Sequence, residues 1–187
     1  DLDEDAIKAS NYLFLEGYLV ASPKGMEICK KAIEVAKESG TKVSISLSDP
    51  NIVNAFKNEI KTLLDMKCDL IFCNEDEALA YAEKDNILDA VQIFKGISPN
   101  FLITQGSSGC LGFDGKNEFN IPGIKVNAID SNGAGDMFAG AVLYCITSGS
   151  TLEKGAIFGC YAASKVVGNV GPRLIKNEYH EIKNNFF

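Results

Sequence analysis

The sequence is poor in the residue types on which several classes of protein depend. Its one histidine is His180, close to the C-terminus, which argues against a zinc site with imidazole ligands and against a Ser–His–Asp triad. Its one arginine is Arg173, and the net charge is −7. Because surfaces that bind nucleic acid are basic and usually rich in arginine, we expect no nucleic-acid partner.

Long hydrophobic runs are also missing. Runs such as residues 138–146 fall far short of the roughly 20 apolar residues that a membrane-spanning helix needs. The chain starts with an acidic segment, Asp1 to Asp5, where a signal peptide carries a basic one. We therefore expect no membrane partner and a cytoplasmic location.

The six cysteines form no C-x-x-C pair, and each lies in a mostly apolar stretch. Free and largely buried thiols in a reducing compartment fit this pattern best. With 187 residues, 46% of them hydrophobic, the chain has the length of one domain and enough apolar surface for one core. It begins at Asp1 without an initiator methionine, so we expect part of a longer protein.

Apolar segments of two kinds alternate along the first two thirds of the sequence. Short runs bounded by Gly, Asn or Asp predict strands at 12–15, 42–47, 68–73 and 101–104. Capped amphipathic stretches predict helices at 22–40, from 48, from 74, at 87–94, at 135–148 and at 152–167. Four glycines within residues 105–115 indicate short antiparallel strands and turns up to residue 126. The order predicts one three-layer α/β/α, Rossmann-like domain whose sheet is mostly parallel, with a small antiparallel edge.

The stretch that carries chemistry is Asp130-Ser131-Asn132-Gly133-Ala134-Gly135-Asp136. It predicts a turn that leads into a helix, where Gly133 and Gly135 let the backbone approach a ligand closely. Free N–H groups at a helix start bind anions, and a carboxylate in the first turn reaches the same space. Taken alone, the pattern also fits a capped helix with Ser131 as the cap.

The same stretch, extended to Gly140, resembles the D-[ST]-x-G-A-G-D-x-F-x-G signature of ribokinase-like (PfkB) kinases. Seven fixed positions make a chance match in this length rarer than about one in a thousand. The resemblance implies that Asp136 is the catalytic base. It further implies that Gly133, Ala134 and Gly135 form, with the N–H of Asp136, an anion hole for the transferred phosphoryl group.

Asn74-Glu75-Asp76-Glu77 resembles the N-x-x-E motif of the same family. Asn74 and Glu77 lie one helical turn apart and face the same way. The resemblance implies that both act on Mg²⁺ through its waters, and Asn74 also on the ATP phosphates. Alone, the pattern fits a helix cap followed by acidic residues in the first turn.

Thr104-Gln105-Gly106-Ser107-Ser108-Gly109 resembles the family's T-x-G-x-x-G nucleotide loop, which implies ATP contacts from Thr104, Gly106, Ser107 and Gly109. Gln105 stands where many members carry a basic residue, so one phosphate contact is missing there. Without the other motifs, a hairpin turn explains the same residues. A weaker resemblance around 161–164 and 170–173 implies an adenine pocket, and Asp130 with carbonyls near Asn169 as a site for a monovalent cation such as K⁺.

The resemblance covers nearly all of residues 1–187 but aligns them with the C-terminal, ATP-binding and catalytic part of a typical member. It implies an enzyme that uses ATP and Mg²⁺ to phosphorylate a hydroxyl of a nucleoside or sugar. Leu15–Leu19, Ser46–Pro50 and Tyr161–Ser164 look closest to the adenosine-kinase-like branch, and a homodimer stays an option for the assembly.

Two alternatives remain beside an ATP-dependent kinase. A non-catalytic nucleotide-binding relative is disfavoured because it has no need of Asp136 facing a phosphate cradle. A Rossmann-type dinucleotide binder needs G-x-G-x-x-G directly after the first strand, whereas Gly133-Ala134-Gly135 lies late in the chain. The identity of the substrate is left open.

Overall fold

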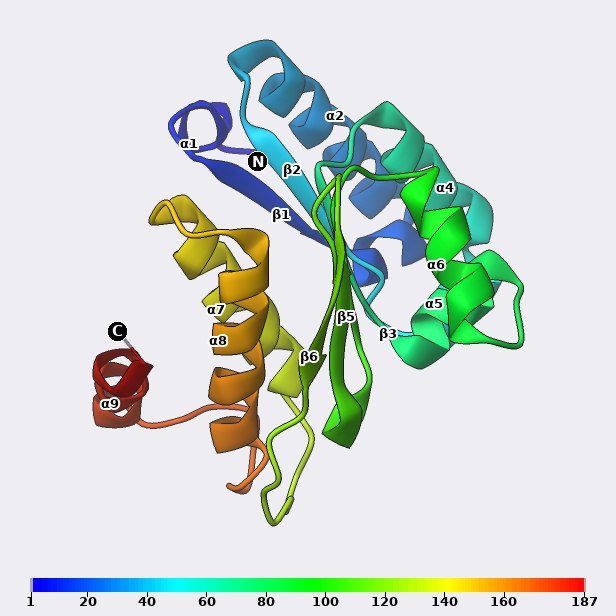
Figure 1. Ribbon diagram of the computed structural model, residues 1–187. Coiled ribbons are helices and arrows are strands. Elements are labelled where there is room, and N and C mark those ends of the chain that lie inside the picture. The colour runs from blue at the N-terminus through cyan, green and yellow to red at the C-terminus, as the bar shows by residue number, and fades with distance from the viewer. Residues whose placement is uncertain (1, 187) are drawn as a thin grey trace. The chain divides into compact units, whose positions relative to one another are not determined.

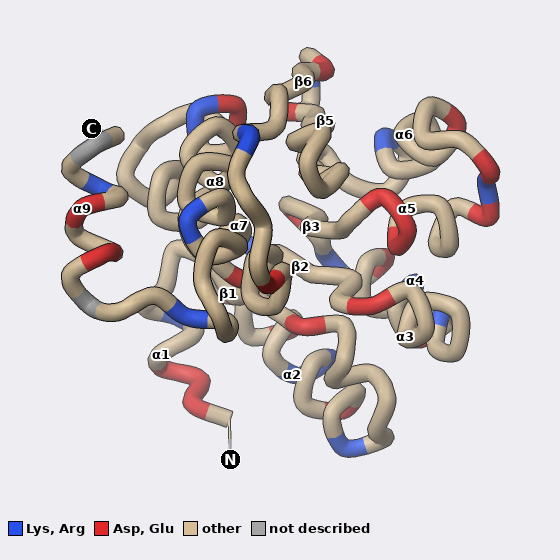
Figure 2. The backbone as a smooth tube through the Cα atoms, turned by 90° about the horizontal axis from the view of Figure 1, so that it is seen from below, with Lys and Arg blue, Asp and Glu red and all other residues tan. Residues whose placement is uncertain are grey.

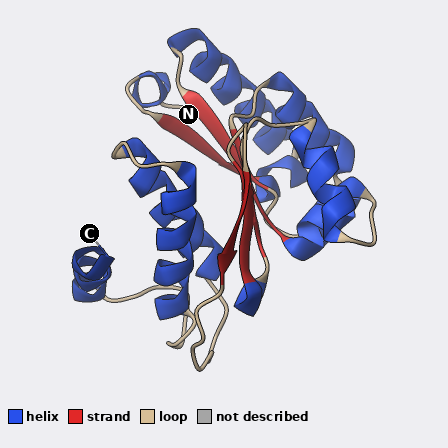
Figure 3. Ribbon diagram, in the orientation of Figure 1, coloured by secondary structure: helices blue, strands red, loops and turns tan. Residues whose placement is uncertain are grey.

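Strands and helices alternate along the chain in the order that the sequence predicts (Figure 3). The computed structural model describes residues 2–186, apart from the side chains at 176 and 185. The strands are β1 (Tyr12–Glu16), β2 (Lys42–Ser46), β3 (Leu70–Asn74), β4 (Phe101–Thr104), β5 (Gly109–Phe113) and β6 (Glu118–Pro122). They form one sheet in the order β1-β2-β3-β4-β5-β6. Most of the sheet is parallel, and the strands from β4 to β6 are antiparallel. The predicted α/β fold class is confirmed.

The helices include each one that the sequence predicts. These are α2 (Pro23–Ser39), α3 (Pro50–Ala55), α5 (Glu75–Ala82), α6 (Ile87–Lys95), α7 (Ala134–Thr147) and α8 (Leu152–Val166). Five further segments were not predicted: α1 (Glu4–Lys8), α4 (Lys57–Met66), α9 (Lys176–Phe186) and the 3₁₀ turns η1 (Gly17–Ala21) and η2 (Gly106–Ser108). Among the described residues, none of these helices is both long and apolar enough to cross a bilayer.

The chain divides into two compact units. The first comprises residues up to Ile103 together with Phe113–Asn117, and the second comprises Thr104–Gly112 and the chain from Glu118 onward. In the first unit β1, β2 and β3 run parallel, with Leu15 opposite Ile45 and Ile45 opposite Ile71. These three side chains are buried, which explains why the strands appear in the sequence as short apolar runs.

Local signals set the helix boundaries of the first unit. The hydroxyl of Ser22 accepts a hydrogen bond from the amide of Gly25 at 3.0 Å, Pro23 opens α2, and Gly40 ends it in the left-handed conformation at φ +78°. A serine cap, an N1 proline and a C-terminal glycine are the features from which this helix was predicted. The limits of α2 are therefore determined by short-range chemistry.

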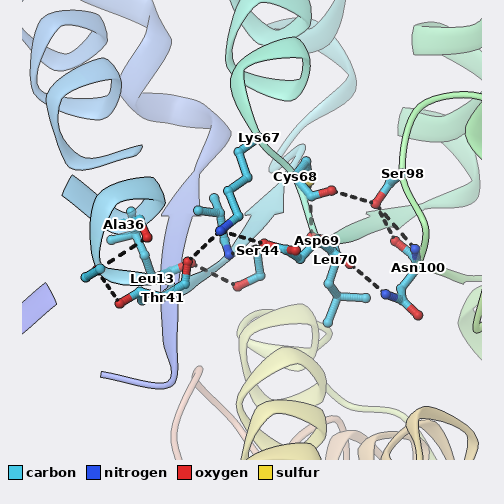
Figure 4. Close-up of polar contacts among 12 residues, drawn as sticks. Leu13, Ala36, Thr41, Ser44, Lys67, Cys68, Asp69, Leu70, Ser98 and Asn100 are labelled. Carbon is cyan, nitrogen blue, oxygen red and sulfur yellow. Dashed lines mark hydrogen bonds and ion pairs between the residues drawn. The ribbon is translucent and has the colours of Figure 1, made fainter. Parts of the chain in front are cut away.

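Polar side chains tie the amino ends of the strands together in the first unit (Figure 4). The carboxylate of Asp69 accepts from the amide of Val43 at 2.8 Å, and the side-chain amide of Asn100 donates to the carbonyl of Asp69 at 2.8 Å. The ammonium group of Lys67 donates to the carbonyl of Thr41 at 2.9 Å. These hydrogen bonds hold the amino ends of neighbouring strands together.

In the second unit, α7 and α8 lie side by side (Figure 1). A Cβ atom on Gly159 of α8 would lie 2.7 Å from the ring of Phe138 in α7, so only glycine fits there. By contrast, a Cβ atom on Gly140 of α7 would meet nothing within 4 Å. The close approach of α7 and α8 is therefore made through a glycine of α8.

None of the six cysteines forms a disulfide, and five of them are buried, as the sequence predicts. Burial raises the pKa of Cys68 to about 12 and that of Cys160 to about 11. A thiol with so high a pKa is a poor nucleophile and a poor metal ligand. These two cysteines therefore act as packing residues.

Candidate active site

The start of α7 lacks a side-chain cap among the described residues. Gly133 occupies the N-cap position at φ +76°, and Ser131, which a capped helix would use, instead accepts the amide of Ala134 on its backbone carbonyl at 3.2 Å. A Cβ atom on Gly133 would lie 2.3 Å from the carbonyl oxygen of Pro172. Both the backbone conformation and the close approach of Pro172 therefore require glycine here.

Two amides in the first turn of α7 are available to a ligand. The amide of Ala134 is bonded to Ser131, and that of Met137 donates to the carbonyl of Gly133 at 3.0 Å. The amides of Gly135 and Asp136 have no acceptor among the described residues. Gly135 is exposed and has open space at its Cβ position. Unpaired amides at a helix start bind an anion, so the local geometry fits an anion hole.

A cavity of about 550 Å³ lies beside this helix start, within the second unit. Its wall includes Ala134 and Gly135 and the predicted nucleotide loop, represented by Thr104, Gly106, Ser107 and Gly109. Apolar side chains complete it, among them Ile124, Val126, Phe138 and Val167. We call it the nucleotide cavity. Its volume lies in the range of small-molecule sites, and its wall combines apolar side chains with the backbone of the helix start and of the loop.

A second cavity, of about 700 Å³, is lined by Asp136. We call it the aspartate cavity. Its wall includes Met137, Gly140 and Tyr144 of α7, and Arg173 beyond α8. The first turn of α7 thus contributes Gly135 to one cavity and the next residue, Asp136, to the other. A group held by the amide of Gly135 and a group held by the carboxylate of Asp136 would meet at this turn.

Asp130 fixes the loop in front of α7. One carboxylate oxygen accepts from the amide of Asn132 at 2.9 Å and the other from the amide of Gly171 at 2.9 Å. The hydrogen bond from Asn132, followed by that from Gly171, lowers the pKa of this carboxyl group. Asp130 therefore holds the 130–133 turn and the segment that carries Pro172 together. Its part in a monovalent-cation site stays a prediction.

Asn74 and Glu77 close a capping box at the start of α5, in the first unit. The amide of Glu77 donates to the side-chain oxygen of Asn74 at 2.8 Å. In return, the backbone and side-chain N–H groups of Asn74 donate to the two carboxylate oxygens of Glu77 at 3.0 and 2.7 Å. The helix-cap interpretation of this motif is thus correct as structure. The role of the same carboxylate toward hydrated Mg²⁺ stays a prediction.

Burial raises the pKa of Glu77 to about 7, with smaller contributions from the charges of Asp49, Asp76 and Glu16. Its side chain is only 5% exposed. Acidic residues at the start of α5 are visible as red segments in Figure 2. A buried carboxylate among other acids is stabilised by a proton or a cation nearby. The arrangement fits a group that acts on the water shell of a divalent cation.

The sequence did not predict that Glu16 and Asp49 act electrostatically on Glu77, or that Ser48 holds Glu16. The hydroxyl of Ser48 donates to Glu16 at 3.1 Å and accepts the amide of Gly17 at 2.7 Å, with Ser48 itself at φ +71°. Glu16 ends β1, and Ser48 and Asp49 follow β2. The available signal was position, because polar residues directly after parallel strands gather at the carboxyl edge of a sheet.

The candidate residues fall into two groups. Asn74 and Glu77 belong to the first unit; the second contains Asp136, Asp130, the anion-hole residues and the loop from Thr104 to Gly109. Among the described residues, no cluster of three or more His, Cys, Asp or Glu side chains forms a direct metal site. A Mg²⁺ ion needs no such cage, since it usually keeps several waters and binds one or two carboxylates and the phosphates of a substrate.

Comparison with known proteins gives a consistent result. The model of a family described as pfkB family carbohydrate kinase matches residues 1–178. A deoxyribokinase of Salmonella typhi is 29% identical over 150 residues, which cover 74% of this chain and 47% of that protein. The chain spans about half the length of the curated relatives that it matches.

Two solved structures extend the comparison. An adenosine kinase from Sinorhizobium meliloti matches with a TM-score of 0.94 at 26% identity, covering 99% of this chain and 57% of that one. An aminoimidazole riboside kinase from Salmonella enterica, complexed with aminoimidazole riboside and an ATP analog, matches with a TM-score of 0.81 at 16% identity. It covers 92% of this chain and 62% of that one, and at this identity supports the fold alone.

Proposed function

Because the chain belongs to the pfkB family of carbohydrate kinases, we propose that it is the ATP-binding and catalytic part of a kinase that phosphorylates a hydroxyl of a nucleoside or sugar. One observation carries the proposal: the uncapped first turn of α7 lines the nucleotide cavity with Gly135 and the aspartate cavity with Asp136. Phosphoryl transfer needs a donor and an acceptor that meet in line at one point. This turn offers an anion hole and a carboxylate at that point.

The residues of the nucleotide cavity fit ATP. Ile124, Val126 and Val167 give apolar walls suited to a base, and the glycines of the 104–109 loop leave its backbone accessible. The amides of Gly135 and Asp136 point to a place for the γ-phosphoryl group, whose oxygens carry the charge in the transition state. Mg²⁺, when bound, neutralises charge on the phosphates, and Glu77 with Asn74 would hold its waters.

In the reaction, the carboxylate of Asp136 accepts a hydrogen bond from the attacking hydroxyl and then takes its proton. The acceptor oxygen forms a bond to the γ-phosphorus while the bond from that phosphorus to the bridging oxygen breaks, so ADP leaves with those electrons. The amides of Gly135 and Asp136 donate to the transferred group throughout. A carboxylate is a weak base, but a loose transition state mainly requires positioning. Asp136 returns the proton to solvent when the product leaves.

The acceptor class follows from the relatives rather than from the cavities. The named relatives include a deoxyribokinase and an adenosine kinase. Both names refer to substrates that carry a sugar hydroxyl. Three stretches of the sequence resemble the adenosine-kinase-like branch: Leu15–Leu19, Ser46–Pro50 and Tyr161–Ser164. We propose adenosine or a related nucleoside first and a free sugar second.

The proposal is tested with the complete protein, Mg²⁺ and ATP. ADP release is measured with adenosine, deoxyribose, ribose or fructose, and the phosphorylated product is identified by mass spectrometry. One acceptor should raise ADP release far above the rate with water alone. If ATP binds but no acceptor in a broader panel of nucleosides and sugars is phosphorylated, the non-catalytic nucleotide-binding alternative is correct.

A further inference from the structure

The nucleotide cavity has one charged side chain in its described wall. Lys125 lines it, whereas its other lining residues are uncharged, from Thr104 and Ser107 at the loop to Ser164 and Val167 at the end of α8. No carboxylate contributes to this wall. An ammonium group in this wall can donate a charged hydrogen bond to an anionic ligand.

The backbone places Lys125 at this wall through anchors on both sides. The amide of Gly123 donates to the carbonyl of Ser108 at 3.0 Å, and a Cβ atom on Gly123 would lie 2.0 Å from the carbonyl oxygen of Ser107. At the other end, the amide of Ile129 donates to the carbonyl of Val167 at 2.7 Å. The segment between these anchors passes from the predicted nucleotide loop to the end of α8, with Lys125 near its middle.

The ammonium group of Lys125 is available for a ligand. It is exposed, and the part of the chain that the structure describes offers it no ion pair or hydrogen-bond acceptor. The loop from Thr104 to Gly109 contains no cationic residue, because its sequence is Thr-Gln-Gly-Ser-Ser-Gly. The N–H groups of α7 supply only partial charges, while the polyphosphate of ATP is an anion that forms its strongest hydrogen bonds with charged donors.

We propose that Lys125 is a further nucleotide-binding residue, which donates to the polyphosphate of ATP and supplies the cation that the 104–109 loop lacks. The proposal rests on the proposed function, because it requires that this cavity binds ATP. It makes Lys125 a determinant of the preference for triphosphate over nucleoside in this cavity. It assigns the residue no part in proton transfer.

The experiment measures binding of ATP, ADP and adenosine to the complete protein by titration calorimetry, without an acceptor. Lys125→Met removes the charge and keeps the length of the side chain, and Lys125→Arg keeps the charge. Lys154→Met is the matched control, since Lys154 is an exposed lysine in the first turn of α8 and lines neither cavity. Melting temperatures of all variants verify that they fold.

Lys125→Met should weaken ATP and ADP by about 10- to 100-fold, the range for a hydrogen bond to a charged group, and adenosine by less than about twofold. Lys125→Arg should stay within about threefold of the parent, and Lys154→Met should match it. The ATP affinity of the parent should also fall more steeply with KCl than that of Lys125→Met.

Three results would overturn the proposal. Equal ATP affinity in Lys125→Met and the parent removes Lys125 from the site but leaves the proposed function intact. An equal loss for adenosine and ATP means that the side chain covers the base and not the phosphates. If the parent itself binds no ATP, the proposed function fails first, and the role of Lys125 fails with it.

Discussion

The side chains of Asn74 and Glu77 hold each other in place across the first turn of α5. Asn74 donates to Glu77 at 2.7 Å through its side chain and at 3.0 Å through its backbone, and accepts the amide of Glu77 at 2.8 Å. The contact satisfies two amides at the helix start and at the same time buries a carboxylate. Glu77 therefore caps the helix and, because its pKa is raised to about 7, also changes charge near neutral pH.

The stability of the protein should depend on pH through Glu77. Burial raises the pKa of Glu77 to about 7 in the folded state, above its ordinary value of 4.5, so between these pH values the folded state binds more protons than the unfolded state. The free energy of unfolding should therefore fall as pH rises from about 4.5 to 7. In Glu77→Gln this decrease should be absent. At pH 8 the variant should be more stable than the parent by about 1–2 kcal/mol, after the loss of one hydrogen bond is subtracted.

Urea unfolding of the parent and Glu77→Gln at several values between pH 4.5 and 8 provides the measurement. Glu153→Gln serves as the control, because Glu153 is an exposed acid in the first turn of α8. Parallel stability curves for the parent and Glu77→Gln would mean that Glu77 ionises normally despite its burial.

Glu77→Gln should also raise the magnesium requirement of the complete enzyme more than it weakens ATP. In Glu77→Gln, hydrated Mg²⁺ loses the charged carboxylate that binds its waters. ATP, by contrast, is held mainly by backbone groups and apolar side chains of the second unit. We expect a several-fold increase in the Mg²⁺ concentration for half-maximal rate and little change in ATP affinity measured without Mg²⁺. Asp76→Asn, an exposed neighbour in the same turn, is the control. A magnesium titration identical to that of the parent would remove Glu77 from the site.

The sequence predicts most of the fold because its signals are local. The Ser22–Pro23 start and the Gly40 end of α2 are short-range features that the structure repeats. Helix α9, from Lys176 to Phe186, was not predicted. Its described residues Ile182 and Phe186 join a cluster with Phe158 and Ala162, so its stability comes from contacts with a distant part of the chain.

The candidate site divides in the same way. Gly133, Gly135 and Asp136 could be predicted from the sequence, because only certain residues fit an uncapped helix start that faces an anion. Lys125 and Glu16 carry no local signal, since Lys125 lies in a segment without regular secondary structure and Glu16 at the end of a strand. Their importance depends on which cavity or which carboxylate the fold places beside them, and that is decided by long-range packing.

Gly133→Ala should destabilise the protein and weaken ATP binding, whereas Gly140→Ala should not. Gly133 has φ +76°, and its Cβ atom would lie 2.3 Å from the carbonyl oxygen of Pro172, so we expect a loss of about 1–3 kcal/mol. Gly140 lies inside α7 with open space around it, and alanine there should stabilise the helix by up to about 1 kcal/mol. Thermal unfolding of both variants provides the measurement. Equal melting temperatures would show that the turn in front of α7 can move away from Pro172.

Asp136→Asn in the complete enzyme is the most direct test of the site. Asparagine keeps the size of the side chain, and the N-cap of α7 is Gly133, so folding and ATP affinity should survive with a stability change below about 1 kcal/mol. Asparagine cannot accept the proton of the attacking hydroxyl. Loss of a positioned base removes about 10²- to 10⁴-fold of rate, and the loss should appear in kcat and not in the KM for ATP.

If Asp136 only favours the helix dipole, the same change gives a small loss of stability and nearly unchanged turnover. Measuring turnover, ATP affinity and melting temperature on the same preparations separates these outcomes. A variant that keeps more than about a tenth of the parental kcat, well above the range for a lost base, would leave the mechanism without its proton acceptor.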